Sequence, residues 1–283
     1  MTADPALHRR LDDFARSLRV LFVAGLPGTG KSLVIHQLAH LAAAAGRLVH
    51  LLQWDVVRPA FETSEPGRRY PVVHGVTHAL VRKAVGLWVR GALARWNERW
   101  PGSQHFLIGE TPFIGHRLIE LARRGNDDAE PILAAASCRF AIAVPSPAVR
   151  RVLEAERERR TVAPLHPRER EDAPPHVLRD LWRQLLGAGR ELGIPVHGVA
   201  ADAAYEPEIY RRVYESLLRH RHVEVLTLDT VLPTEHFSVY DFAVSHREVV
   251  PGPGEAESAF AQLKACRRQP TALAAEMERW WLV

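Results

Sequence analysis

Eight residues near the start of the chain combine glycine, lysine and serine in an order that suits phosphate binding. The segment has the spacing G-x-x-x-x-G-K-[ST], and its residues are Gly25, Leu26, Pro27, Gly28, Thr29, Gly30, Lys31 and Ser32. Glycines let the backbone wrap closely around a polyphosphate, and the amides at the start of a following helix add a favourable dipole. Lys31 would then reach the β- and γ-phosphates, while the Ser32 hydroxyl would bind Mg²⁺. The spacing therefore predicts a nucleoside triphosphate site.

The segments on either side of this loop, and the scarcity of lysine in the chain, both favour a phosphate-binding loop. Residues 18–24 form an apolar run typical of a buried strand, and residues 33–45 have the character of a helix, as a strand–loop–helix unit requires. Of 37 basic residues only three are lysines, namely Lys31, Lys83 and Lys264. A lysine in that loop position is therefore hard to attribute to chance. The alternative is an ordinary glycine-rich turn between a strand and a helix.

Three polar residues follow the next two apolar segments, and their chemistry suits phosphoryl transfer. Asp55 and Arg58 come after residues 47–54, and Glu110 comes after residues 105–109. A carboxylate can accept the proton of an acceptor hydroxyl while an arginine holds the acceptor in line. Glu110 can hold Mg²⁺ or its water, contact the substrate or act as the base. The alternatives are helix-capping acids beside a surface arginine.

A strongly charged helix is predicted over residues 148–160, before a proline-rich segment at 164–175. It carries five arginines, which are Arg150, Arg151, Arg157, Arg159 and Arg160. Arginines that close over a transferring phosphoryl group stabilise its negative charge and exclude water. Arg157 and Arg160 are the candidate catalytic arginines. Glutamates interleave with them, so a solvated helix with internal ion pairs is the alternative.

The arrangement of apolar segments predicts an α/β fold. Five apolar strands separated by helices indicate a parallel sheet with helices on both faces, in which ligands gather at the carboxyl ends of the strands. The expected strands are 18–24, 47–54, 105–109, 139–144 and 223–228, with a further short strand at 195–199 and an extra one at 238–244. The expected helices include 76–100, 115–124, 176–192, 207–221 and a helical tail at 255–281.

Composition narrows the class of protein. A chain of 283 residues with 47% hydrophobic and 25% charged residues is typical of a globular protein, and it shows neither a signal peptide nor an apolar run of membrane-spanning length. Two cysteines indicate no disulfide framework, so we expect a cytoplasmic location. The net charge of +4 suits anionic substrates. Nucleic acid is a less favoured partner because no basic patch is interleaved with aromatic residues.

Together these residues resemble the P-loop kinases that act on nucleosides, nucleotides and small molecules. This group includes adenylyl-sulfate kinases, shikimate kinases and the chloramphenicol phosphotransferase and zeta-toxin group. The resemblance covers about residues 18–232 and rests on the 25–32 loop, on Asp55-x-x-Arg58, on Glu110 and on the arginines of 150–160. It implies a P-loop NTPase three-layer fold with sheet order 2-3-1-4-5. It also implies ATP as donor, Mg²⁺, a hydroxyl-bearing acceptor over strands two and three, and an arginine lid.

The expected organisation is a kinase-like domain over residues 1–232, with its lid at about 148–175, and a helical C-terminal extension at 233–283 that packs on the same domain. The predicted function is Mg²⁺-assisted phosphoryl transfer from ATP to a small-molecule, nucleoside or nucleotide hydroxyl. Two other functions remain open. One is ATP hydrolysis by a switch or motor protein, and the other is nucleotide binding by a regulator, which would not need Asp55 or the lid arginines.

Overall fold

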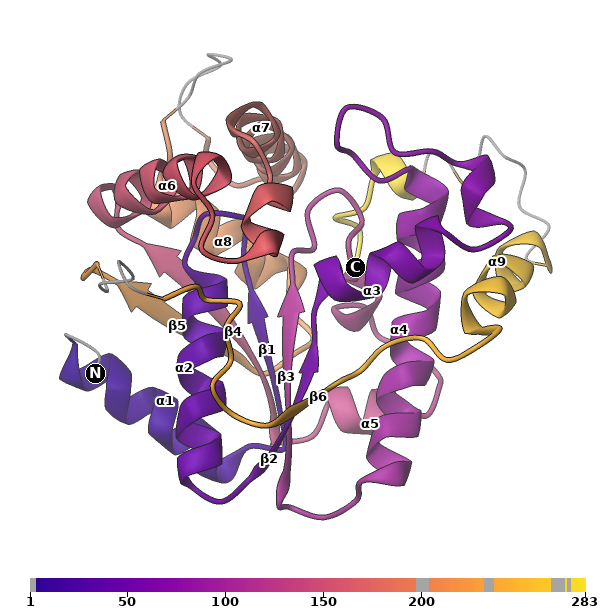
Figure 1. The fold of residues 1–283 in the computed structure, drawn as a ribbon. Coiled ribbons are helices and arrows are strands. Elements are labelled where there is room, and N and C mark those ends of the chain that lie inside the picture. The colour runs from indigo at the N-terminus through magenta and orange to yellow at the C-terminus, as the bar shows by residue number, and fades with distance from the viewer. Residues whose placement is uncertain (1–3, 197–203, 232–236, 266–272, 274–275) are drawn as a thin grey trace.

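The computed structural model describes residues 4–196, 204–231, 237–265, 273 and 276–283. Within these residues all strand pairs are parallel and form one sheet of six strands in the order β5-β4-β1-β3-β2-β6 (Figure 1). The strands are β1 (Val20–Ala24), β2 (Leu48–Leu52), β3 (His105–Thr111), β4 (Cys138–Pro145), β5 (Val223–Leu228) and β6 (His246–Glu248). The predicted order is correct for the first five strands. The prediction of a five-stranded sheet is wrong, because β6 extends the sheet beyond β2.

Side chains that alternate along β1–β5 enter two separate cores. In β1, Val20 and Phe22 face one core, while Leu21 and Val23 face the other. The second core is covered by α1 (Pro5–Ser17) and α2 (Lys31–Ala44), and the first by α3 (Trp54–Glu62), α4 (Ala79–Arg99), α7 (Pro175–Glu191) and α8 (Pro207–Leu217) (Figure 1). A parallel sheet is apolar on both faces and needs such cover. The prediction of helices on both faces is confirmed.

Helix α6 (Pro147–Val162) lies beyond the carboxyl ends of the strands (Figure 1). It starts where β4 ends, because Pro147 suits the first helical position and the Ser146 Oγ accepts a hydrogen bond from the Val149 N–H at 3.3 Å. A 3₁₀ turn, Pro167–Glu171, follows α6 and packs against it. These two elements stand over the edge of the sheet where the sequence predicts ligand binding.

The helix predicted at 115–124 is wrong. The segment contains only a 3₁₀ turn, Ile119–Leu121, and the φ angles of His116 and Leu118 are 66° and 61°. Positive φ angles are incompatible with a right-handed helix, so the backbone coils irregularly after β3. Its apolar residues are nevertheless buried in the core, among them Leu118. The apolar residues of 115–124 are spaced as in a helix because they are buried in a compact loop.

The extra strand predicted at 238–244 is also displaced. Residues 237–244 pass across α2, where Phe242 and Val244 pack against the core beneath that helix (Figure 1). The chain reaches the free edge of β2 only after this crossing, and there it forms β6. The Val249 N–H continues the pairing by donating to the Leu51 carbonyl oxygen at 2.8 Å. Because residues 237–244 contact α2, the strand forms only after them, although the apolar pattern of 238–244 is the stronger one.

Two other predicted elements lie partly outside the described residues. The helical tail begins as expected with α9 (Glu255–Ala265), which packs on α4, but residues 266–272 and 274–275 lie outside the described part. So does most of the strand predicted at 195–199. A short helix, α5 (Glu130–Leu133), precedes β4. No helix among the described residues is long and apolar enough to cross a membrane.

A glycine beside the predicted acid on β3 offers a test of the sheet packing. Gly109 pairs with Phe22 in the β1–β3 register, and a Cβ on Gly109 would overlap the Phe22 ring. We therefore expect Gly109→Ala to lower the free energy of unfolding by about 1–3 kcal/mol, because the strands must shift to relieve the overlap. Denaturant unfolding measures the change.

The matched control is Gly187→Ala in α7, where a new Cβ would meet nothing within 4 Å. We expect this variant to be as stable as the wild type or up to about 1 kcal/mol more stable, because alanine is the better helix former. Equal effects of the two substitutions would contradict the close packing of Gly109 on Phe22.

Candidate functional site

A cavity of about 670 Å³ opens at the carboxyl edge of the sheet. The β1–α2 loop, the first turns of α3, the end of β3, α6 and residues 237–240 all contribute to its walls. It is lined by each of the predicted catalytic side chains, which are Lys31, Asp55, Arg58, Glu110, Arg157 and Arg160. From the glycine-rich loop it is also lined by Leu26, Pro27, Gly28, Gly30 and Ser32, while Gly25 and Thr29 lie behind this surface. Residues from segments far apart in the sequence thus share one cavity.

The glycine-rich loop is held in a defined conformation. Gly30 has a φ of 86° and is the N-cap of α2, a backbone conformation that glycine adopts without strain. The Lys31 ammonium donates to the Leu26 carbonyl oxygen at 2.9 Å, and the Thr29 hydroxyl donates to the same oxygen at 2.8 Å. On the other side, the Leu26 N–H donates to the hydroxyl of Tyr210 from α8 at 3.3 Å. The loop is therefore closed by its own side chains and anchored by α8.

The centre of the site is an ion pair between Lys31 and Glu110. Their Nζ and Oε1 atoms are 3.3 Å apart, and only 4% and 12% of the two side chains are exposed. The β1–β3 register produces this contact, because it pairs Glu110 with Val23 just before the loop. Burial lowers the pKa of Lys31 and raises that of Glu110, and the opposite charge of each residue counteracts the shift of the other. Each charge therefore depends on its partner.

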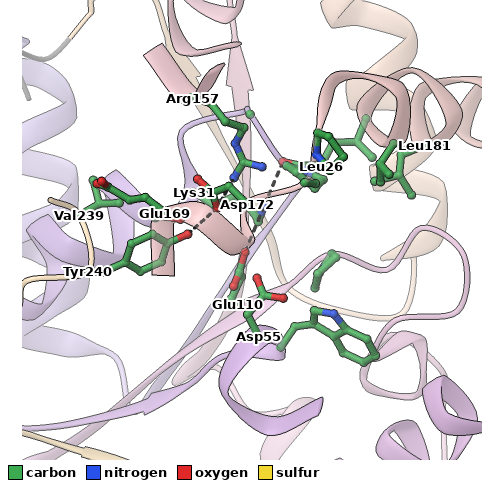
Figure 2. Close-up of a pocket in the computed structure, with 18 of the residues that line it drawn as sticks. Leu26, Lys31, Asp55, Glu110, Arg157, Glu169, Asp172, Leu181, Val239 and Tyr240 are labelled. Atoms are coloured by element: carbon green, nitrogen blue, oxygen red, sulfur yellow. Dashed lines mark hydrogen bonds and ion pairs between the residues drawn. The ribbon is translucent and has the colours of Figure 1, made fainter. Parts of the chain in front are cut away.

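Asp55 lies in the first turn of α3 rather than at the tip of a strand, because β2 ends at Leu52. Its side chain is 56% exposed and accepts a hydrogen bond from Arg58 Nε at 3.2 Å. Arg58 is also paired with Glu62 at 3.0 Å. The charge of Asp55 contributes to the raised pKa of Glu110, so the two carboxylates lie within electrostatic reach of each other. In Figure 2, Asp55 points toward the Lys31–Glu110 pair.

Two of the five arginines on α6 line the cavity. Arg157 points toward Lys31 and Glu110 from the side opposite Asp55 (Figure 2), and its Nη2 is 3.1 Å from Asp172 Oδ1. Arg160 is paired with Glu156 at 2.7 Å. The other three do not line the cavity: the Arg150 guanidinium lies 4.3 Å from the Tyr205 ring centroid, and Arg151 and Arg159 are exposed. The helix therefore presents one pair of arginines to the site.

Several residues in and beside the cavity wall have no signal in the sequence. The Tyr240 hydroxyl donates to Asp172 Oδ1 at 2.8 Å, and the Ser238 hydroxyl donates to Glu169 Oε1 at 2.7 Å. These contacts join the C-terminal extension to the segment after α6, across 68 residues of sequence for Tyr240 and Asp172. Arg117 also lines the cavity, from the segment mistaken for a helix. Only the folded chain brings these residues together.

Oxygen donors suitable for Mg²⁺ are present beside the loop. The Ser32 hydroxyl and the Glu110 carboxylate both line the cavity, and hard oxygen ligands of this kind fit a magnesium ion that keeps substrate oxygens and water as further ligands. Within the described parts of the chain no three His, Cys, Asp or Glu residues gather in a way that could hold a metal ion. A metal at this site would therefore depend on substrate oxygens.

Comparisons of the chain with protein-family models, curated proteins and solved structures found no match. The interpretation of the site therefore depends on its geometry and chemistry.

The buried ion pair makes a direct prediction about stability. We expect Glu110→Gln to lower the free energy of unfolding by about 3 kcal/mol or more, because the substitution leaves the Lys31 charge buried without its partner. Denaturant unfolding at neutral pH measures the difference.

Glu208→Gln is the matched control, since Glu208 pairs with Arg211 on the surface of α8 with 64% of its side chain exposed. Exposed pairs contribute little, so we expect no measurable loss. A Glu110→Gln protein as stable as this control would show that Lys31 does not need Glu110 in the folded chain.

Proposed function

We propose that the protein is a kinase that transfers the γ-phosphoryl group of ATP to a hydroxyl of a small-molecule, nucleoside or nucleotide acceptor. One observation carries the proposal: Lys31, in a glycine-rich loop at the end of β1, lines the same cavity as an exposed carboxylate, Asp55, and an arginine, Arg157. Phosphoryl transfer requires a cation for the phosphates, a base for the acceptor and a charge that stabilises the transition state. The cavity contains all three.

The loop would hold the triphosphate. Its backbone amides and the N-terminus of α2 would bind phosphate oxygens, and Lys31 would exchange its hydrogen bond to the Leu26 carbonyl for a β- or γ-phosphate oxygen. A bound Mg²⁺, held by Ser32 with Glu110 directly or through water, would neutralise charge on the phosphate oxygens. Glu110 would then supply an oxygen ligand while it stays paired with Lys31.

Asp55 would then act on the acceptor. Its exposed carboxylate is free of the Lys31 contact that holds Glu110, so it is the better candidate for the general base. The acceptor hydroxyl gives its proton to Asp55 while its oxygen forms a bond to the γ-phosphorus. The bond from that phosphorus to the β,γ-bridging oxygen breaks at the same time, and ADP leaves with the electron pair.

Arg157 would stabilise the charge that spreads over the transferring group. It comes from α6, above the carboxyl edge of the sheet, and points toward the Lys31–Glu110 pair (Figure 2). Its present partner is Asp172, whose pKa is raised by burial. A phosphoryl group entering the cavity would compete with Asp172 for the guanidinium, which couples the position of α6 to the presence of substrate.

Removal of the loop cation tests nucleotide binding. We expect Lys31→Ala to weaken ATP binding at least about tenfold in calorimetry, because the triphosphate loses its closest cation. Lys264→Ala is the control, because Lys264 is an exposed lysine of α9 that does not line the cavity. Equal ATP affinity in both variants would contradict the proposed site. Binding without ADP production on any acceptor in a panel of nucleosides, sugars, antibiotics and nucleic-acid ends would favour the regulator instead.

Removal of the Asp55 charge tests the transfer step. We expect Asp55→Asn to leave ATP affinity nearly unchanged and to lower turnover by about a hundredfold or more, because general-base catalysis is worth about 10²- to 10⁴-fold. Asp229→Asn is the control, since Asp229 is an exposed acid beyond the carboxyl end of β5 that does not line the cavity. Unchanged turnover of the Asp55 variant would assign the base to another residue.

A further inference from the structure

Two arginines near the end of β3 have no acidic partner among the residues that the structure describes. Arg117 lines the cavity, and its Nη1 donates to the Ile114 carbonyl oxygen at 2.7 Å. Arg82, from the first turns of α4, donates to the Gly115 carbonyl oxygen. Neither arginine forms an ion pair with any carboxylate in the described part of the chain. The other lining arginines described above all have such a partner: Arg58 with Asp55, Arg157 with Asp172 and Arg160 with Glu156.

The two guanidinium groups converge on one point. A Cβ built on Gly115 would lie 2.8 Å from the Nη1 atoms of both Arg82 and Arg117, and 3.0 Å from Gln184 Oε1. Gly115 has a φ of 68°, so the turn that brings the two arginines together favours glycine. Two like charges this close repel each other, and a carboxylate or phosphate placed between them would remove the repulsion.

Burial of the two arginines makes an anion beside them more favourable. Burial lowers the pKa of both arginines, and for Arg117 the charge of Arg82 adds to the effect. A guanidinium nevertheless remains protonated at neutral pH, so its charge persists and must be compensated. The charge of Asp55 partly offsets the shift at Arg117, which places that carboxylate within electrostatic reach of Arg117. The proposed base thus lies in the part of the cavity that Arg117 lines.

A second cavity adjoins the first at this position. It has a volume of about 600 Å³, and both cavities are lined by Arg117, Val177 and Leu181. Arg82 and Gln184 line the second cavity as well. Its acidic lining residues, Asp180, Glu191 and Glu278, form no ion pair with either arginine, and Asp180 is paired with Arg183. The arginines therefore lie where an acceptor could extend from the phosphoryl-transfer site.

We propose that the acceptor carries a carboxylate or phosphate group in addition to the hydroxyl that is phosphorylated, and that Arg117 together with Arg82 binds this anionic group. The inference rests on the proposed kinase function. Arginine forks bind planar carboxylates and phosphates through paired N–H donors, which adds orientation as well as affinity. Binding of the anion at Arg117 would place a nearby hydroxyl at Asp55, so the site would select small anionic acceptors over neutral ones.

A binding experiment separates this inference from nucleotide binding. Inorganic phosphate is titrated by calorimetry into the Lys31→Ala protein and into the Lys31→Ala/Arg117→Gln protein, so that the loop cation is absent from both. We expect phosphate to bind the first, and its affinity to fall at least tenfold in the second. Equal phosphate affinity in the two proteins, or no binding to either, would overturn the inference, whatever the wild type does with ATP.

Steady-state kinetics provide a second test of the inference. Acceptors are compared in pairs: glucose with glucose 6-phosphate and gluconate, and nucleosides with their 5′-monophosphates. We expect ADP production with the anionic members, and a KM for the anionic acceptor raised at least tenfold by Arg117→Gln while the KM for ATP is unchanged. Arg117→Lys, which keeps the charge, should recover part of the loss. Faster turnover of the neutral members would overturn the inference and leave the kinase proposal intact.

Two further variants guard against a purely structural effect. Arg179→Gln is the matched control, because Arg179 is exposed on α7, the helix that also lines both cavities, and should leave all constants unchanged. Arg82→Gln repeats the test from another element if thermal melting shows that Arg117→Gln does not fold. A folded Arg82→Gln protein with wild-type phosphate affinity and wild-type acceptor KM would assign both arginines to holding the turn at 113–117.

Discussion

A lysine ammonium buried at the carboxyl end of β1 needs a compensating charge, and the neighbouring strand β3 supplies it. Removing either ion from water costs several kcal/mol, which is offset only when the partner and additional hydrogen bonds are in place. The β1–β3 register places Glu110 at Lys31, and the Leu26 carbonyl oxygen accepts a hydrogen bond from the same ammonium. Loop conformation, strand pairing and the charge of the cavity are therefore coupled, and a change in one affects the others.

Five arginines in and beside the cavity fall into two groups. Arg58, Arg157 and Arg160 are each neutralised by a neighbouring carboxylate, whereas Arg82 and Arg117 interact with backbone carbonyls. Paired arginines keep their orientation without a ligand and can exchange a carboxylate for a phosphoryl group. Arginines without an acidic partner keep an uncompensated charge that attracts anions. This difference supports distinct roles in the proposed reaction, with a transferring group on one side and an anionic acceptor on the other.

The C-terminal extension belongs to the same structure. Strand β6 continues the sheet beyond β2, and α9 packs on α4, where the Trp88 indole N–H donates to Glu255 Oε2 at 2.7 Å. Residues before β6 contribute directly to the site, because Tyr240 lines the cavity and donates to Asp172, the partner of Arg157. The extension thus helps to position the segment that follows α6, although no motif within it indicates such a role.

The sequence by itself determined the layered α/β fold and the residues expected at one edge of the sheet, and its resemblance to P-loop kinases implied the order of the first five strands. Alternating apolar strands and helices demand a sheet covered on both faces, and parallel strands bring their carboxyl ends together. Lys31, Asp55 and Glu110 were therefore expected at one edge, and they line the same cavity there. Only the tertiary structure decided the coil after β3, the place of β6 and the contacts of Tyr240 and Arg117. These features depend on positive φ angles and on contacts between residues distant in sequence, and the spacing of apolar residues along the chain predicts neither.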